Sequence, residues 1–226
     1  MGKSDIKLIG SWASAFTTRV RIAFNIKNVE YEHLEEVLGK KSDLLLQSNP
    51  VHKKFPVLLH DGKPLPESLI IVQYIDEVWS SGPSILPADP LDRALERFWA
   101  AYVDEKFFPS LKLVRVTQGE QLAAAVEAVG KSFEVLDGAF HQCSKGNAFF
   151  GGERVGYLDI AFGCTLAWLR ALEKIVGVKL FDEVKHPALA KWMDSFCSDP
   201  AVDGLIPETD RFIEFLKLLP GAPPRH

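Results

Sequence analysis

Cysteine is scarce in this chain of 226 residues: there are three, and none precedes Cys143. Three thiols without metal-type spacing predict neither a disulfide framework nor a zinc site, and they suit a reducing compartment. Long apolar runs are also missing, so no segment is expected to cross a bilayer. An excess of positive charge is absent, because the formal net charge is −4. A nucleic-acid binder, which needs a strongly basic face, is therefore not expected.

Targeting signals are absent from the N-terminal sequence MGKSDIK. It lacks the apolar core of a signal peptide, and Ile6 stands where a myristoylation signal needs Ser or Thr. We therefore expect a cytoplasmic protein that is not anchored to a membrane. The composition, with 47% hydrophobic and 25% charged residues, is that of a globular protein whose length allows one large or two small domains.

Residues 1–79 alternate between strand and helix patterns. Strands are predicted at residues 6–10, 31–37 and 56–60, and helices at residues 16–27, 41–47 and 67–79. Asp61-Gly62 is the strongest hairpin signal in the chain, so a further strand follows it. This order predicts a small mixed sheet with helices packed on it.

The remainder of the chain is helical in pattern. A segment with three prolines, SSGPSILPADPLD, indicates a linker. Helical patterns then run over residues 91–117, 120–143, 156–176, 187–198 and 208–219. We expect a first domain at residues 1–79, a linker at 80–90 and an all-helical domain at 91–226.

The stretch GSWASAFTTRVRIAF joins the first strand to the first helix and holds two serines, Ser11 and Ser14, at the junction. Proteins that begin with a strand, a loop and a helix often carry a reactive cysteine at this point. Judged locally, Ser14 is most simply an N-cap of the helix.

The motifs RVRIAF, LEEVLGKKSDLLLQSNP, SNPVHKKFPVLLHDGKPLPESLIIVQYIDEVW and GYLDIAFG resemble the plant tau class of cytosolic glutathione transferases over nearly the whole chain. The resemblance implies an α/β thioredoxin-like N-terminal domain followed by an all-α helical C-terminal domain. It also implies conjugation of the glutathione thiolate to hydrophobic electrophiles, glutathione peroxidase activity, and a role in detoxification and stress response. Glutathione would be the co-substrate, no metal would be needed, and the protein would be a homodimer.

One departure from the tau pattern lies beside Ser14. The class usually has Ser-Pro-Phe or Ser-Pro-Tyr, whereas this chain has Ser14-Ala15-Phe16. Because alanine does not fix φ as proline does, we expect a more mobile loop and a catalytic rate that differs from the usual rate of the class.

The resemblance assigns roles around glutathione. Ser14 would be catalytic, donating its hydroxyl to the thiolate near a helix N-terminus that favours ionisation. Glu67 and Ser68 would hold the γ-glutamyl ammonium and carboxylate, although an acidic first helical turn explains the same pair. The backbone of Phe55, before a cis proline, would bind the cysteinyl unit. Two lysines would bind the glycyl carboxylate, although short basic clusters are usually solvated: Lys41 and Lys54.

The electrophile is expected where the two domains face each other. The candidates are aromatic side chains and one lysine, namely Trp12, Phe16, Phe108, Lys112, Trp168, Phe212 and Phe215. Aromatic residues at helical spacing are more often core than pocket. All three cysteines lie in the helical half, and none is expected to be a nucleophile.

Two other functions compete with the enzyme. The chain could be a non-catalytic carrier of apolar plant metabolites, or a structural or regulatory protein with a protein partner. An intact set of glutathione residues argues against the second alternative. A conjugation assay with a chromogenic halobenzene separates the enzyme from the carrier.

Overall fold

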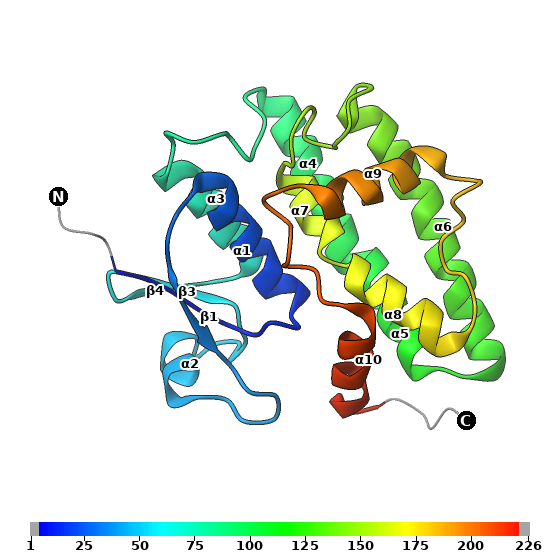
Figure 1. Cartoon of the computed structure of the whole chain (residues 1–226), viewed down its shortest axis with the longest axis horizontal. Helices are drawn as coiled ribbons and strands as arrows, with labels where there is room; N and C mark the ends of the chain where they lie inside the picture. The colour runs from blue at the N-terminus through cyan, green and yellow to red at the C-terminus, as the bar shows by residue number, and fades with distance from the viewer. Residues whose placement is uncertain (1–4, 222–226) are drawn as a thin grey trace. The chain divides into compact units, whose positions relative to one another are not determined.

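A computed structural model describes residues 5–221 and divides the chain between Leu86 and Pro87 into two compact units (Figure 1). We call them the sheet unit and the helical unit. Residues 1–4 of the N-terminal segment considered above lie outside the described part.

The sheet unit begins with β1 (Ile6–Gly10), α1 (Ala15–Lys27), β2 (Glu32–Glu35) and α2 (Asp43–Ser48), and continues with β3 (Val57–His60), β4 (Lys63–Pro66) and α3 (Ser68–Val78). The strand order is β2-β1-β3-β4. β1 runs parallel to β2 and antiparallel to β3, which pairs antiparallel with β4. The predicted mixed sheet is therefore confirmed.

Helices cover both faces of this sheet, with α1 and α3 on one side and α2 on the other (Figure 1). On the α2 side, Leu45 packs with Ile9, Val57 and Leu59, and Leu34 adds to the cluster. Successive strand residues point to opposite faces. Leu8 and Leu58, which pair with each other and are fully buried, therefore point to the side of α1 and α3.

The hairpin between β3 and β4 has the predicted turn. Its two central residues, Asp61 and Gly62, have φ of 49° and 75°. Positive φ at both positions defines the turn whose twist matches the flanking strands, and Asp-Gly is a preferred pair there.

The helical unit contains α4 (Pro90–Tyr102), a π-helical segment η1 (Val103–Phe107), α5 (Phe108–Val116), α6 (Gly119–Ser144), α7 (Tyr157–Gly163), α8 (Leu166–Val176), α9 (Pro187–Ser198) and α10 (Thr209–Leu218). No residue described in this unit belongs to a named strand, in agreement with the helical pattern.

Two predicted helices were wrong as uninterrupted α-helices. The pattern over residues 91–117 is broken by η1, directly before the turn that holds Pro109. Proline has no N–H to donate, and in an α-helix its ring clashes with the carbonyl four residues earlier. The wider π turn gives room for the ring and leaves that carbonyl without an α-helical partner. The pattern over residues 156–176 breaks because the N–H and hydroxyl of Thr165 both donate to the Phe162 carbonyl, at 2.9 and 2.6 Å.

Packing explains the glycine that ends α7. A Cβ atom on Gly163 would lie 2.2 Å from the ring of Phe196 on α9. Only the missing side chain lets these elements approach so closely. Among residues 5–221, no helix combines the length and apolarity needed to cross a membrane.

A buried ion pair joins the two helices on one face of the sheet. Lys27 Nζ on α1 lies 2.7 Å from Asp76 Oδ1 on α3, with side chains only 1% and 10% exposed. The same carboxylate accepts the N–H groups of Ile85 and Leu86, at 2.9 and 3.0 Å. Asp76 therefore ties α1, α3 and the end of the sheet unit together.

Asp76→Ala should lower the free energy of unfolding by about 3–5 kcal/mol, because it leaves the buried Lys27 charge uncompensated. The matched control is Glu77→Ala, an exposed neighbour on α3, which should change the value by less than about 0.5 kcal/mol. Urea unfolding followed by tryptophan fluorescence measures both. If Asp76→Ala and Glu77→Ala lowered the free energy of unfolding equally, the buried ion pair would make no specific contribution to stability.

Candidate active site

The sheet register brings four loops to one edge. Ile9 pairs with Val57, and Val57 pairs with Pro66. The residues that follow β1, precede β3 and follow β4 therefore lie side by side. Gly10 pairs with Glu35, so the loop after β2 leaves from the same edge. Every glutathione residue expected from the sequence belongs to one of these loops.

Ser14 is the N-cap of α1. Its Oγ accepts the N–H of Thr17 at 3.2 Å, its backbone is extended, and its side chain is half-buried. The loop before it is closed by a hydrogen bond from the Ser14 N–H to the Ser11 carbonyl, at 3.1 Å. A hydroxyl oxygen that accepts one hydrogen bond still carries a proton that it can donate.

Glu67 has an unusual backbone directly before α3. Its φ is 75° and ψ 109°, in a region that residues with a Cβ rarely occupy. Its side chain is 57% exposed and lies 4.0 Å from His52 Nε2. A strained, exposed carboxylate at a helix start is the arrangement expected of a ligand-binding position.

Sequence reasoning missed Arg19, which lies beneath this position. The guanidinium donates to Ser68 Oγ at 3.4 Å and sits 4.9 Å from the Phe16 ring centroid, and the residue is 1% exposed. Its only sequence signal was its place four residues before Ala23, on the predicted buried face of α1. It adds positive charge beside the buried hydroxyl of Ser68.

The cis peptide expected between Phe55 and Pro56 is present. Asn49, which is 2% exposed, fixes the loop before it: its Nδ2 donates to the Lys54 carbonyl at 2.8 Å, and its Oδ1 accepts the His52 N–H at 3.1 Å. Lys41 and Lys54 are both exposed, as cations that bind an exposed carboxylate would be.

The electrophile candidates of the helical unit form one row of side chains. The ring of Phe108 meets Trp168 at 5.3 Å, Trp168 meets Phe212 at 6.0 Å, and Phe212 stacks on Phe215 at 6.0 Å. Lys112 Nζ lies 4.6 Å from the centroid of Phe108. Phe212 is fully buried, whereas Phe215 is partly exposed. In the sheet unit, Trp12 and Phe16 are both partly exposed and flank Ser14 in the chain.

Burial disfavours the thiolate form of two cysteines in the helical unit. Burial and the nearby Glu96 raise the pKa of the Cys143 thiol to about 11. Burial also raises the pKa of the Cys197 thiol. Within the described residues, no group of three or more His, Cys, Asp or Glu side chains is arranged to hold a metal ion.

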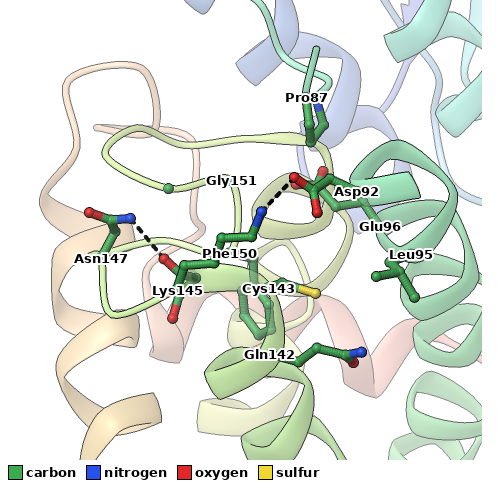
Figure 2. Close-up of a pocket in the computed structure, with 12 residues that line it drawn as sticks. Pro87, Asp92, Leu95, Glu96, Gln142, Cys143, Lys145, Asn147, Phe150 and Gly151 are labelled. Atoms are coloured by element: carbon green, nitrogen blue, oxygen red, sulfur yellow. Dashed lines mark hydrogen bonds and ion pairs between the residues drawn. The ribbon is translucent and has the colours of Figure 1, made fainter. Parts of the chain in front are cut away.

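A small pocket of about 110 Å³ lies beside α4 and the end of α6 in the helical unit (Figure 2). Lys145 Nζ contacts Asp92 there at 2.7 Å, next to Glu96 and Cys143. Glu96 is 2% exposed and accepts the N–H of Leu158 at 3.4 Å.

Two buried carboxyl groups lie close together behind this pocket. Burial raises the pKa of Glu96 to about 8, and the charge of Asp159 adds to the rise. Burial raises the pKa of Asp159 to about 6, although Gly151, Gly156, Trp192 and Phe150 donate hydrogen bonds to it. Of the two carboxyl groups, Glu96 has the higher pKa.

A raised carboxyl pKa makes folding less favourable as pH rises, because the unfolded chain loses its proton first. For Glu96 the free energy of unfolding should fall between pH 4.5 and about 8, by about 1.4 kcal/mol per pH unit. Above pH 6.5, where Asp159 is mostly ionised, Glu96→Gln should remove most of this decline. Urea unfolding at pH 6.5, 7.2 and 8.0, with exposed Glu153→Gln as control, measures it. A decline that persists in Glu96→Gln would show that another group titrates.

Comparison with known proteins shows the family of the chain. Residues 4–77 match the glutathione S-transferase N-terminal domain, and residues 91–200 match the glutathione S-transferase C-terminal domain. The chain is 58% identical over 221 residues to glutathione S-transferase U17 of Arabidopsis thaliana, covering 96% of each chain. It is 52% identical to glutathione S-transferase U18 of the same plant, covering 97% of each.

Two solved structures are similar throughout. A tau class glutathione S-transferase from mango, Mangifera indica, is 60% identical with a TM-score of 0.92, over 95% of this chain and 98% of that one. A rice glutathione S-transferase in complex with glutathione is 35% identical with a TM-score of 0.88, over 96% and 97% of the two chains.

Proposed function

The chain belongs to the tau class of plant glutathione S-transferases, and we propose that it is a serine-type transferase in which Ser14 activates the thiol of glutathione. The activity is transfer of glutathione to an electrophile. The carrier alternative is not favoured, because the similar proteins are named as transferases.

The observation that carries the proposal is the double hydrogen-bonding capacity of Ser14. Its oxygen accepts the Thr17 N–H, and its proton is free to point at a sulfur placed beyond the helix start. A free cysteine thiol has a pKa of about 8.5, so most of it is protonated at neutral pH. A donated hydrogen bond and the positive end of the α1 dipole both favour the thiolate. The thiolate then attacks the electrophilic carbon and the leaving group departs.

Glutathione is held by the other loops of the same sheet edge. Glu67 takes the ammonium of the γ-glutamyl unit, while the hydroxyl and N–H of Ser68 take its carboxylate. Arg19, buried beside Ser68, stabilises that carboxylate further. The backbone of Phe55 pairs with the cysteinyl unit, and Lys41 and Lys54 take the glycyl carboxylate.

The electrophile contacts the aromatic row of the helical unit. Phe215 and Lys112, which are the more exposed members, reach the substrate, and Phe108, Trp168 and Phe212 support them. Lys112 suits an anionic leaving group. Trp12 and Phe16 of the sheet unit, which flank Ser14 in the chain, stay sequence-based candidates for electrophile contact. We further propose that the protein is a cytoplasmic homodimer.

Ser14→Ala should leave glutathione affinity nearly unchanged and raise the pKa of the bound thiol by one to two units. Turnover at neutral pH should then fall by roughly ten- to a hundredfold. Loss of the cap should also lower stability by ~1 kcal/mol. Thiolate absorbance against pH, measured beside thermal unfolding, separates the two effects.

The control is Asp89→Ala, which removes the N-cap of α4. It should cost similar stability and leave the thiolate titration unchanged. If Ser14→Ala behaved in the same way as this control, Ser14 would be a cap without a role in catalysis.

Glu67 can be tested with two variants that separate binding from strain. Glu67→Ala and Glu67→Gly both remove the partner of the ligand ammonium, so both should weaken glutathione binding by roughly 30-fold or more. Glycine tolerates a φ of 75°, so Glu67→Gly should be more stable than Glu67→Ala by about 1 kcal/mol. Calorimetric titration and thermal unfolding measure the two quantities. Unchanged affinity in both variants would contradict the assignment.

A further inference from the structure

We propose that two consecutive glutamates, Glu35 and Glu36, position two different halves of the active site. Glu35 positions the loop that carries Ser14, and Glu36 positions the loop that carries Lys41. The inference rests on the proposed roles of Ser14 and Lys41, and it concerns residues that do not themselves contact glutathione.

Strand geometry sends the two side chains in opposite directions. Leu34 packs with Leu45 of α2, so Leu34 faces α2. Side chains alternate along a strand, and therefore Glu36 faces α2 as well, while His33 and Glu35 face the other side. The alternation continues past the end of β2, because the Glu36 N–H donates to the Gly10 carbonyl at 2.7 Å.

Glu35 reaches the backbone of the loop between β1 and α1. The Trp12 N–H donates to both carboxylate oxygens, at 3.0 and 3.2 Å. His33 Nε2 lies 2.8 Å from Oε2 and orients the carboxylate from its other side. Trp12 stands two residues before Ser14. The loop is thus fixed by Glu35 at Trp12 and by Thr17 Oγ1 at the Ser11 N–H, 3.2 Å away.

Glu36 fixes the base of the next loop. It is 6% exposed, accepts the Ser42 N–H at 3.1 Å, and also accepts the Ser42 hydroxyl. Ser42 in turn caps α2 by accepting the Leu45 N–H at 3.0 Å. Lys41 is the residue directly before Ser42, so its backbone position follows from this buried carboxylate.

The two loops serve different steps, which makes the roles separable. Ser14 acts on the thiol, so a displaced Ser14 changes the chemical step. Lys41 binds the glycyl carboxylate, so a displaced Lys41 changes the affinity for glutathione. A carboxylate that only stabilised the fold would not change kcat and the affinity for glutathione separately.

The experiment compares Glu35→Ala and Glu36→Ala in steady-state kinetics with glutathione and a halobenzene. Glu35→Ala should lower kcat by about tenfold, because small displacements of a reacting group are costly, and should raise the thiol pKa of bound glutathione. Its KM for glutathione should stay within about twofold. Glu36→Ala should raise the KM for glutathione by about fivefold and leave kcat within about twofold, since one ion pair of several is weakened.

Conservative variants and a control exclude a general loss of structure. Glu35→Gln keeps an oxygen that can accept the Trp12 N–H, so it should recover part of kcat; Glu36→Gln should likewise recover part of the KM. The control is Glu32→Ala on the same strand, whose carboxylate pairs with Lys7 at 3.3 Å. It should change neither constant.

Parallel losses of kcat and affinity that follow melting temperature, in both alanine variants, would overturn the inference. If Ser14→Ala lowered turnover as expected while Glu35→Ala left kcat unchanged, the inference would be wrong and the proposed function would stand. If Ser14→Ala left the thiolate titration unchanged, the proposed function itself would fail.

Discussion

The site depends on one hydrogen bond, from the Thr17 N–H to Ser14 Oγ. A hydroxyl has one proton and two lone pairs. As an acceptor, the Ser14 oxygen caps the N-terminus of α1 and is held at the positive end of the helix dipole. As a donor, the same group has a proton left for a sulfur anion. In the proposed function, capping and activation of a thiol would therefore use different capacities of one hydroxyl, and the cap would fix the geometry of the activation. A cysteine at this position would supply its own nucleophile, whereas a serine needs the thiol of its ligand.

The sheet register extends this local constraint to the whole proposed glutathione site. Val57 of β3 pairs with Ile9 of β1 on one side and with Pro66 of β4 on the other. The segment with Phe55 and the start of α3 with Glu67 therefore meet the loop of Ser14 at one edge, although they lie 41 and 53 positions after Ser14 in the chain. The positive φ of Glu67 costs about 1–3 kcal/mol. The buried Arg19 and the buried Glu96 are further local costs, which hydrophobic packing within each unit offsets.

Sequence patterns predicted the strands, most helices and the Asp61-Gly62 turn, because each depends on local periodicity or turn chemistry. The resemblance added the glutathione residues, which no periodicity could assign. Three features escaped both approaches. The π segment η1 reflects how a helix accommodates Pro109, and the break after α7 reflects the two hydrogen bonds that Thr165 donates to the Phe162 carbonyl. Arg19 escaped because charge on a buried helix face becomes meaningful only when its partner, Ser68, is known. The two helix breaks depend on local hydrogen bonding that periodicity does not report, whereas the role of Arg19 depends on a contact between distant segments.

The alanine at position 15 brings these arguments together. It occupies the first position of α1, where proline is well tolerated because its missing N–H would have no helical partner. Relative to proline, alanine leaves the unfolded chain more freedom, which costs about 0.4–1 kcal/mol of stability. The folded loop must then be ordered by contacts instead of by a fixed φ. Two contacts hold the loop next to Ala15: the Thr17 N–H donates to Ser14, and the Trp12 N–H donates to Glu35. The order that a proline would have built into the chain is supplied here by a cap and a neighbouring strand.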